Sequence, residues 1–272
     1  MTTIKTAIFY EHITEGAEQR KIDVLTAAKE IKSYGIDYVD IPFDSFNSEL
    51  KELLKESGLK IAFMHNNFDF AKTGDAFPAF KMVDTAAELK LKDILIVPGF
   101  VKGDIDYDTA RENIAKALNE LCSYAEDKGV EITLEDFDAD YAPYHTIEEL
   151  LWFLERVPKL KISFDTGNFK YSDQDELKAL DKMIDKVVYV HCKDRSNKKN
   201  DSEGRENIVG ETMYPCAVGS GYIKIETVLK RLVDSGYKGD VVIEHFDVAD
   251  QLKRAKESAE YLNGLIKKLN IQ

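Results

Sequence analysis

The feature that most constrains this sequence is an alternation of short β-branched runs and longer helical stretches from one end to the other. Eight runs carry the strand pattern, at residues 5–10, 36–41, 59–65, 93–97, 130–135, 160–165, 187–191 and 240–244. Between them, apolar residues recur at spacings of three and four, the period of an amphipathic helix. Eight β-then-α units without an internal linker are typical of a (β/α)8 barrel. We therefore predict an α/β fold in which residues 1–272 form a single TIM-barrel domain.

The competing architecture is a doubly wound open sheet, which also alternates strands and helices. No G-x-G-x-x-G motif follows the first run, so the usual dinucleotide-binding form of that fold lacks support. The runs are almost continuously apolar, as expected for parallel strands that are buried on both faces. A length of 272 residues also suits one large barrel. These observations favour the barrel.

Two of the predicted helices carry recognisable end signals. For the helix at 48–57, Asn47 is a suitable N-cap and Gly58 a suitable C′ residue. Thr146, followed three residues later by Glu149, predicts a capping box before the apolar run that starts at residue 147.

The segment 195–214 interrupts this regular pattern. It is polar and contains several charged residues, and it lies between the seventh strand and the last helix–strand pair. Long irregular loops inside compact domains are either functional or disordered. Because this one follows a strand end, we predict that it is a lid over the active site.

Bulk properties narrow the partners and the cellular compartment. The formal net charge is −13, which lowers the expectation of a nucleic-acid partner, because such binding relies on a basic surface. No apolar stretch approaches the roughly 20 residues that span a bilayer, and the N-terminal sequence does not have the pattern of a signal peptide. Cys122, Cys192 and Cys216 are widely spaced and odd in number, so we expect free thiols. A cytoplasmic location, with neither nucleic acid nor membrane as partner, is the expectation.

Polar residues end several of the apolar runs, and in a barrel these ends carry the active site. The last residues of four successive runs are Glu135, Asp165, His191 and Glu244. A polar residue that ends a buried strand needs a partner, and four on successive strands favour one shared site. Three carboxylates and one imidazole suit a hard or borderline divalent ion. We predict one bound metal ion, with Mn²⁺ or Mg²⁺ as the leading choice and Co²⁺ or Zn²⁺ as alternatives.

The remaining histidines give weaker signals. His65 ends the third run and is followed by two asparagines. His12 follows the first run, where the mouth of the barrel and the surface are equally consistent with the pattern. His245 adjoins Glu244, but alternation along a strand directs neighbouring side chains to opposite faces.

The motifs around these strand ends resemble one known superfamily. In chain order they are Leu134-Glu135, Phe164-Asp165-Thr166-Gly167-Asn168, His191-Cys192-Lys193-Asp194, Val218-Gly219-Ser220-Gly221-Tyr222-Ile223 and Ile243-Glu244. This ordered set resembles the xylose-isomerase-like superfamily of TIM barrels, specifically the sugar phosphate isomerase/epimerase group. That group includes ketose 3-epimerases, hydroxypyruvate isomerase and inosose-processing enzymes, and it is distantly similar to the endonuclease IV type of DNA-repair enzyme. The N-terminal half matches only in general pattern and in His65.

The resemblance implies that Glu135, Asp165, His191 and Glu244 bind the metal ion and that the two glutamates also act as catalytic acid and base. Such chemistry passes through an enediolate, which serves both isomerisation and epimerisation. For substrate binding, we expect contributions from four further residues, namely His65, Asn168, Lys193 and Arg195. The substrate would be a small carbohydrate-like molecule, and a homo-oligomer (dimer or tetramer) is a family expectation.

Two departures from the family patterns are informative. Val97 and Asn168 stand where the repair-endonuclease branch has histidines, and several epimerases also have a histidine at the position of Asn168. Without these imidazoles the chain lacks ligands for a multinuclear zinc cluster, and with the acidic net charge this disfavours a DNA-repair endonuclease. Asn168 can still hydrogen-bond a substrate hydroxyl.

Three functions therefore remain open at the level of the sequence. The leading hypothesis is a metal-dependent isomerase or epimerase of a small sugar, sugar phosphate or hydroxy-keto acid. An inosose-type dehydratase would use the same site and then expel a hydroxyl group. A non-catalytic sugar-binding barrel would keep the pocket alone. Lys193 and the Gly219-Ser220-Gly221 turn are the candidates for binding a substrate phosphate.

Overall fold

The computed structural model describes residues 4–270, and eight of its strands pair as a closed parallel barrel. The strands are β1 (Thr6–Phe9), β2 (Tyr38–Pro42), β3 (Lys60–Asn67), β4 (Asp93–Val97), β5 (Glu131–Leu134), β6 (Lys161–Asp165), β7 (Val187–Ser196) and β10 (Val241–Glu244). They follow one another in chain order, and β10 pairs with both β1 and β7, which closes the sheet. The predicted (β/α)8 architecture is therefore confirmed.

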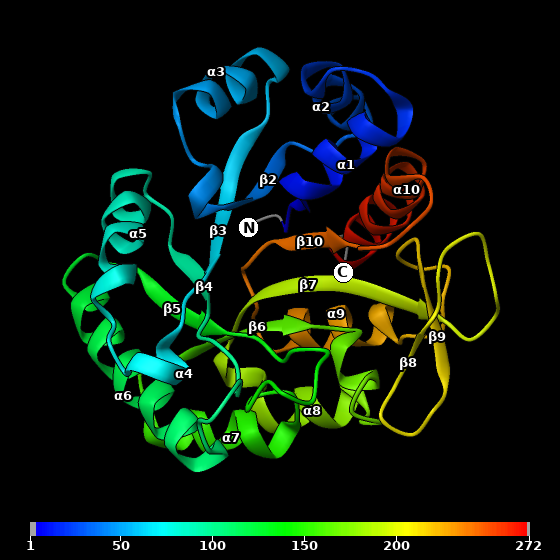
Figure 1. The fold of residues 1–272 in the computed structure, drawn as a ribbon. Helices are drawn as coiled ribbons and strands as arrows, with labels where there is room; N and C mark the ends of the chain where they lie inside the picture. Colours follow the sequence, from blue (N-terminus) through cyan, green and yellow to red (C-terminus); the bar gives the residue numbers. More distant parts are fainter. Residues whose placement is uncertain (1–3, 271–272) are drawn as a thin grey trace. The chain divides into compact units, whose positions relative to one another are not determined.

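By its internal packing the chain divides into two compact units. The first contains residues 4–62, 165–167 and 190–270. Its helices are α1 (Tyr10–Arg20), α2 (Val24–Ser33), α3 (Ser48–Ser57), α9 (Ile225–Asp234) and α10 (Gln251–Asn270). α1 packs against α2 and α10 (Figure 1). The apolar side chains of β1 and β10 are buried.

The second unit contains residues 63–164 and 168–189. Its helices are α4 (Phe70–Thr73), α5 (Phe77–Glu88), α6 (Tyr107–Glu126), α7 (Ile147–Arg156) and α8 (Glu176–Met183). β4 pairs in parallel with β3 and with β5, and β5 pairs with β6. The rings of Phe63 and Tyr189 stack at 3.6 Å in the core of this unit.

The predicted helix ends are confirmed in detail. Asn47 caps α3 by accepting a hydrogen bond from the Leu50 N–H, and Gly58 ends that helix with φ +75°. Thr146 and Glu149 form the reciprocal capping box at the start of α7. These signals are local, so the sequence alone was sufficient to locate them.

Helix α1 was missed at the level of the sequence, because its residues are mostly polar and include a glycine. The structure gives that glycine a packing role: a Cβ atom at Gly16 would lie 2.7 Å from Leu252 Cγ of α10. The close approach of the two helices therefore offsets the low helix propensity of glycine.

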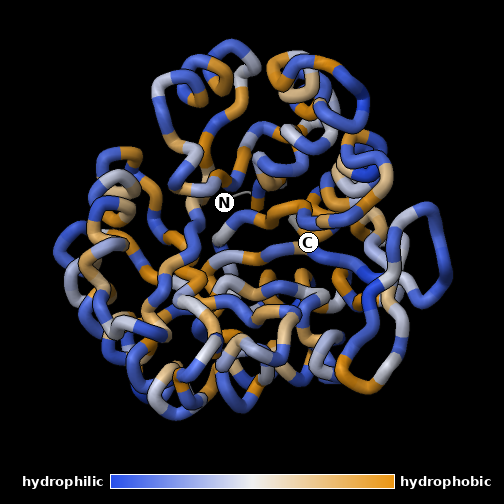
Figure 2. The backbone as a smooth tube through the Cα atoms, in the orientation of Figure 1, coloured by the Kyte–Doolittle hydropathy of each residue, from blue (hydrophilic) through white to orange (hydrophobic). Residues whose placement is uncertain are grey.

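The segment 195–214 is less irregular than predicted. β7 continues to Ser196, and the following residues form an antiparallel pair, β8 (Arg205–Glu206) with β9 (Thr212–Cys216). Asn207 to Gly210 make the turn, with Gly210 at φ +83°. The segment is mostly hydrophilic apart from the exposed Ile208 and Val209 near this turn (Figure 2). Its role as a lid stays a prediction.

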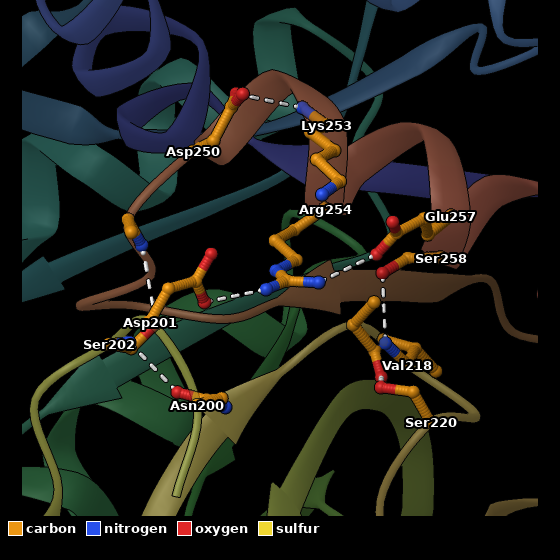
Figure 3. A network of polar contacts seen from close by, with 12 residues as sticks. Asn200, Asp201, Ser202, Val218, Ser220, Asp250, Lys253, Arg254, Glu257 and Ser258 are labelled. Atoms are coloured by element: carbon orange, nitrogen blue, oxygen red, sulfur yellow. Dashed lines mark hydrogen bonds and ion pairs between the residues drawn. The ribbon is translucent and has the colours of Figure 1, made fainter.

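Polar contacts fasten this segment to α10, as Figure 3 shows. Arg254 donates to Asp201 Oδ1 at 2.7 Å and to Glu257 Oε2 at 3.0 Å. The Ala249 N–H donates to Ser202 Oγ at 3.3 Å. A lid movement of residues 200–202 would have to break these bonds.

Among the described residues, no helix is long and apolar enough to cross a membrane. Cys122, Cys192 and Cys216 are buried free thiols, as expected. Burial raises the pKa of Cys122 to about 12 and that of Cys216 to about 11, so both thiols stay protonated at neutral pH.

Two buried histidines connect α1 to the strand end of β10. The rings of His12 and His245 stack with centroids 4.8 Å apart, and His12 Nε2 accepts a hydrogen bond from the His245 backbone N–H at 3.0 Å. Both side chains are almost fully enclosed. This burial lowers the pKa of each imidazole to about 3, so both are neutral in the folded protein.

We predict that acidification destabilises the fold through His12. In the unfolded chain the imidazole binds a proton with a pKa of about 6.5, whereas the folded protein resists protonation down to about pH 3. The unfolded state therefore binds more protons below pH 6.5, and the stability present above that pH is lost as the pH falls. Between pH 7 and pH 5 the expected loss is about 2 kcal/mol from His12 alone.

Urea denaturation at both pH values measures this loss. In His12→Gln the amide oxygen can still accept a hydrogen bond from the His245 N–H. Between pH 7 and pH 5 this variant should lose about 2 kcal/mol less stability than the wild type. An unchanged pH dependence in the variant would contradict the assignment.

Candidate metal centre

The segment Asp165-Thr166-Gly167 leaves the end of β6 and bonds directly to β7. The Thr166 N–H donates to the His191 carbonyl oxygen at 3.0 Å. Its hydroxyl donates to the Lys193 carbonyl oxygen at 2.8 Å and accepts from the Lys193 N–H at 2.9 Å. One threonine therefore fixes the positions of both His191 and Lys193 relative to Asp165.

Gly167 is required by this close contact. A Cβ atom at that position would lie 2.7 Å from the Lys193 carbonyl oxygen, which is closer than real Cβ contacts permit. The Gly167 N–H donates to Asp165 Oδ1 at 2.6 Å, so the turn also orients the aspartate. Asp165 is fully buried.

His191 lies inside β7 rather than at its end, because the strand continues to Ser196. Its imidazole is fully buried between two carboxylates: Nδ1 lies 3.4 Å from Glu244 Oε2, and Nε2 lies 3.2 Å from Asp40 Oδ2. β10 pairs in parallel with β7 and places Glu244 beside Lys193, which lies two residues after His191 on the same face of β7.

Asp40 is a further residue of the candidate site, and it is not among the residues predicted from the sequence. It lies on β2 and is fully buried. A histidine that binds a metal usually donates its second ring N–H to a carboxylate, which fixes the tautomer and the ring orientation. With the hydrogen on Nε2 facing Asp40, the lone pair of Nδ1 is directed to the side where Glu244 lies. The available signal was an aspartate in the middle of the apolar strand YVDIP.

The donor set fits a divalent ion. Glu135, Asp165, His191 and Glu244 are all buried, and a group of these residues could hold a metal ion. Carboxylate oxygens with one imidazole nitrogen suit Mg²⁺, Mn²⁺ and related ions. Asp165, His191 and Glu244 come from the first unit, where buried carboxylates need cationic or hydrogen-bonding partners.

A comparison with known protein families shows to which family this chain belongs. The family model described as "Xylose isomerase-like TIM barrel" matches residues 28–265. This chain belongs to the xylose isomerase-like TIM barrel family. The resemblance drawn from the sequence motifs is thus confirmed at the level of the family.

Individual relatives of this family are distant. An inosose dehydratase of Clostridium perfringens is 26% identical over 170 residues, which cover 56% of this chain and 53% of that protein. The match thus spans about half the length of this curated relative.

Solved structures agree in fold over almost the whole chain. A xylose isomerase-like TIM barrel protein of Mycobacterium smegmatis, in complex with magnesium, has a TM-score of 0.74 at 15% identity and covers 99% of this chain and 98% of that one. A D-allulose 3-epimerase of Methylomonas sp. has a TM-score of 0.72 at 19% identity, with coverages of 97% and 99%. At these identities the likeness is one of fold.

Lys193 is in contact with the carboxylates. Its ammonium lies 3.2 Å from Asp165 Oδ2 and 2.5 Å from Glu244 Oε1, and the residue is 6% exposed. From the sequence, Lys193 is predicted to bind substrate. In the structure the ammonium group is engaged by two of the predicted metal ligands.

The family motif Gly219-Ser220-Gly221 serves a structural purpose here. Asp194, which is buried, accepts hydrogen bonds from the backbone N–H groups of Gly219, Gly221 and Ile223. Burial raises the pKa of Asp194, and these bonds act in the opposite direction by stabilising the carboxylate. Because the glycine N–H groups already serve a carboxylate of the protein, the turn is a poor candidate for binding a substrate phosphate.

The other three residues predicted to bind substrate each contact a different part of the fold. Asn168 is buried and donates through its side-chain amide to the Asp136 carbonyl oxygen at 2.9 Å, which fixes the loop after β5. His65 pairs with Leu95 in the β3–β4 register. Arg195 is mostly buried and pairs with Pro215 of β9. The role of all three in binding substrate stays a prediction.

A cavity of about 760 Å³ opens at the carboxyl ends of β3 and β4. Phe68 and Phe100 line it together with two lysines and two aspartates, Lys72, Lys102, Asp69 and Asp104. The Phe100 ring also lies 5.0 Å from Phe137, two residues after Glu135. The cavity wall is therefore in contact with the loop that follows Glu135.

We predict that Asp40→Asn weakens metal binding by about 10–100-fold, because the amide no longer polarises and orients His191 as a carboxylate does. Isothermal titration of Mn²⁺ into the folded variant measures this. Asp84→Asn, which alters a carboxylate in contact with Tyr124 and Lys128, is the matched control and should bind metal as the wild type does. Equal affinities of Asp40→Asn and wild type would exclude the orienting role.

Proposed function

We propose that this chain is a metal-dependent isomerase or epimerase of a small sugar, acting through an enediolate intermediate. The observation that carries the proposal is the arrangement of His191 between Asp40 and Glu244, with Asp165 fastened to the same strand. Metal-binding histidines usually donate their second ring N–H to a carboxylate, and Asp40 is placed to accept that bond from His191. The sugar epimerases among the solved structures of similar fold support the reaction class.

Glu135, Asp165, His191 and Glu244 would hold the ion. When bound, it would polarise the substrate carbonyl and stabilise the negative charge of the enediolate. In this proposal, Glu135 and Glu244 exchange a proton with the carbon beside that carbonyl. Each carboxylate can act as base in one direction and, once protonated, as acid in the other. Burial excludes water that would otherwise compete for this proton.

The cavity supports an uncharged substrate. Its two lysines and two aspartates carry no net formal charge, whereas a phosphate subsite would need an excess of cations or available backbone N–H groups. Phe68 and Phe100 offer apolar surface to the C–H face of a sugar. We therefore propose that the substrate extends from Glu135 into this cavity of the same unit, and we favour a neutral sugar over a sugar phosphate.

A dehydratase is the second candidate, favoured by the inosose dehydratase among the relatives. It would form the same enolate and then lose a hydroxyl group, with a protonated carboxyl group as the acid. Both reactions begin with the same proton abstraction, so their products distinguish them.

The test of the common first step is proton–deuterium exchange into neutral ketoses and inososes in D₂O with Mn²⁺ or Mg²⁺. We predict metal-dependent exchange that falls by about 10²–10⁴-fold in Glu135→Gln and in Glu244→Gln. Glu126→Gln, an exposed carboxylate paired with Lys159, is the control and should exchange as the wild type does. An epimer or isomer as product supports the leading proposal, and an unsaturated product supports the dehydratase.

Metal binding without exchange in any of these substrates would favour a sugar-binding barrel. Exchange that persists after removal of the metal would contradict the proposed mechanism.

Phe100→Ala should raise KM for the neutral sugar by about 10-fold while changing kcat little, because it removes contact area remote from the reacting carbon. Steady-state kinetics separates the two constants. Phe77→Ala, which truncates an exposed ring at 71% exposure, is the matched control. A fall in kcat alone would place Phe100 outside the substrate subsite.

A further inference from the structure

The Lys193 ammonium occupies a position that a metal ion would also be expected to seek. It lies within 3.2 Å of Asp165 Oδ2 and 2.5 Å of Glu244 Oε1, in an environment almost closed to solvent. Both of these residues belong to the group that could hold an ion. The same two carboxylates thus face a fixed positive charge of the protein.

The backbone of Lys193 is fixed beside the two carboxylates. Its N–H and carbonyl oxygen are both bonded to the Thr166 hydroxyl, and the neighbouring strand places it beside Glu244. Its Cγ lies 3.0 Å from the position that a Cβ at Gly167 would occupy, so the turn packs against the side chain. The lysine is therefore part of the site and not a surface residue that happens to reach it.

Charge explains why a cation belongs there. Asp40, Asp165 and Glu244 are buried carboxylates of the same unit, and like charges at low solvent exposure repel one another strongly. The ammonium group of Lys193 lies between two of them and offsets this repulsion. A divalent ion bound to the same carboxylates would repel that ammonium group, because the two cations share their anions.

We infer that Lys193 is a built-in competitor of the metal ion: it shares Asp165 and Glu244 with the ion, keeps the site folded without metal and lowers the affinity for metal. This inference rests on the proposed metal site and goes beyond it, since it assigns Lys193 to control of the metal rather than to recognition of a substrate.

Metal titration of a charge-deleted variant tests the competition. In Lys193→Met, which keeps the length of the side chain and removes its charge, the affinity for Mg²⁺ and Mn²⁺ by isothermal titration should rise at least about tenfold. Lys193→Arg, which keeps the charge, should bind no more tightly than the wild type. The metal-free Lys193→Met protein should melt at a lower temperature than the wild type and should gain more from added metal.

Lys170→Met is the matched control. Lys170 Nζ lies 2.6 Å from Glu176 Oε2, whose side chain is also buried, so this variant removes a comparable ion pair outside the site. It should lower the melting temperature without changing the affinity for metal. An equal or weaker affinity in Lys193→Met than in the wild type would overturn the inference.

A second measurement uses the unmodified protein, in case Lys193→Met does not fold. The ¹H–¹⁵N resonance of the Lys193 ammonium group, assigned through Lys193→Arg, should shift or broaden as Mg²⁺ is added. A resonance that stays unchanged while Mg²⁺ binds would also overturn the inference. If neither wild type nor Lys193→Met binds Mg²⁺ or Mn²⁺, the proposed metal-dependent function itself fails, which is a different result from equal binding by both.

Discussion

The contact between Thr166 and β7 is the interaction on which the candidate site depends. Three hydrogen bonds join this one residue to the backbone of His191 and Lys193. They bring Asp165, at the end of β6, to the strand that carries the imidazole and the ammonium group. The absence of a side chain at Gly167 makes this approach possible. The turn Asp165-Thr166-Gly167 therefore both ends β6 and positions the side chains of the candidate site.

The buried charges of the first unit form a connected series. Asp40 contacts His191, His191 contacts Glu244, and Glu244 and Asp165 both contact Lys193. Each group would be costly to bury alone, and each is stabilised by a partner of complementary charge or hydrogen-bonding capacity. A change at any member therefore alters the others, which is why metal affinity is a sensitive readout for both Asp40 and Lys193.

The sequence predicted those parts of the molecule that depend on local or periodic signals. The barrel follows from the alternation of strands and helices, and the caps of α3 and α7 follow from residues three positions apart. Asp40 and the competition at Lys193 could not be read in this way, because they depend on which side chains meet across β2, β7 and β10. Helix α1 was missed for the same reason, since Gly16 is explained only by Leu252 of α10.

Strand β7 shows how one short motif serves two purposes. Successive side chains of a strand point to opposite faces, so His191 and Lys193 share one face while Cys192 and Asp194 share the other. On the first face the residues contact Asp40, Asp165 and Glu244. On the second face, the Asp194 carboxylate accepts hydrogen bonds from N–H groups of the turn at 219–223. These bonds fix the segment that leads into α9. Glycine at 221 is needed because a Cβ there would lie 2.2 Å from Asp194 Oδ1. The glycines of this turn are thus explained by their hydrogen bonds and close contact with Asp194. The candidate site instead uses His191 and Lys193, on the other face of the same strand.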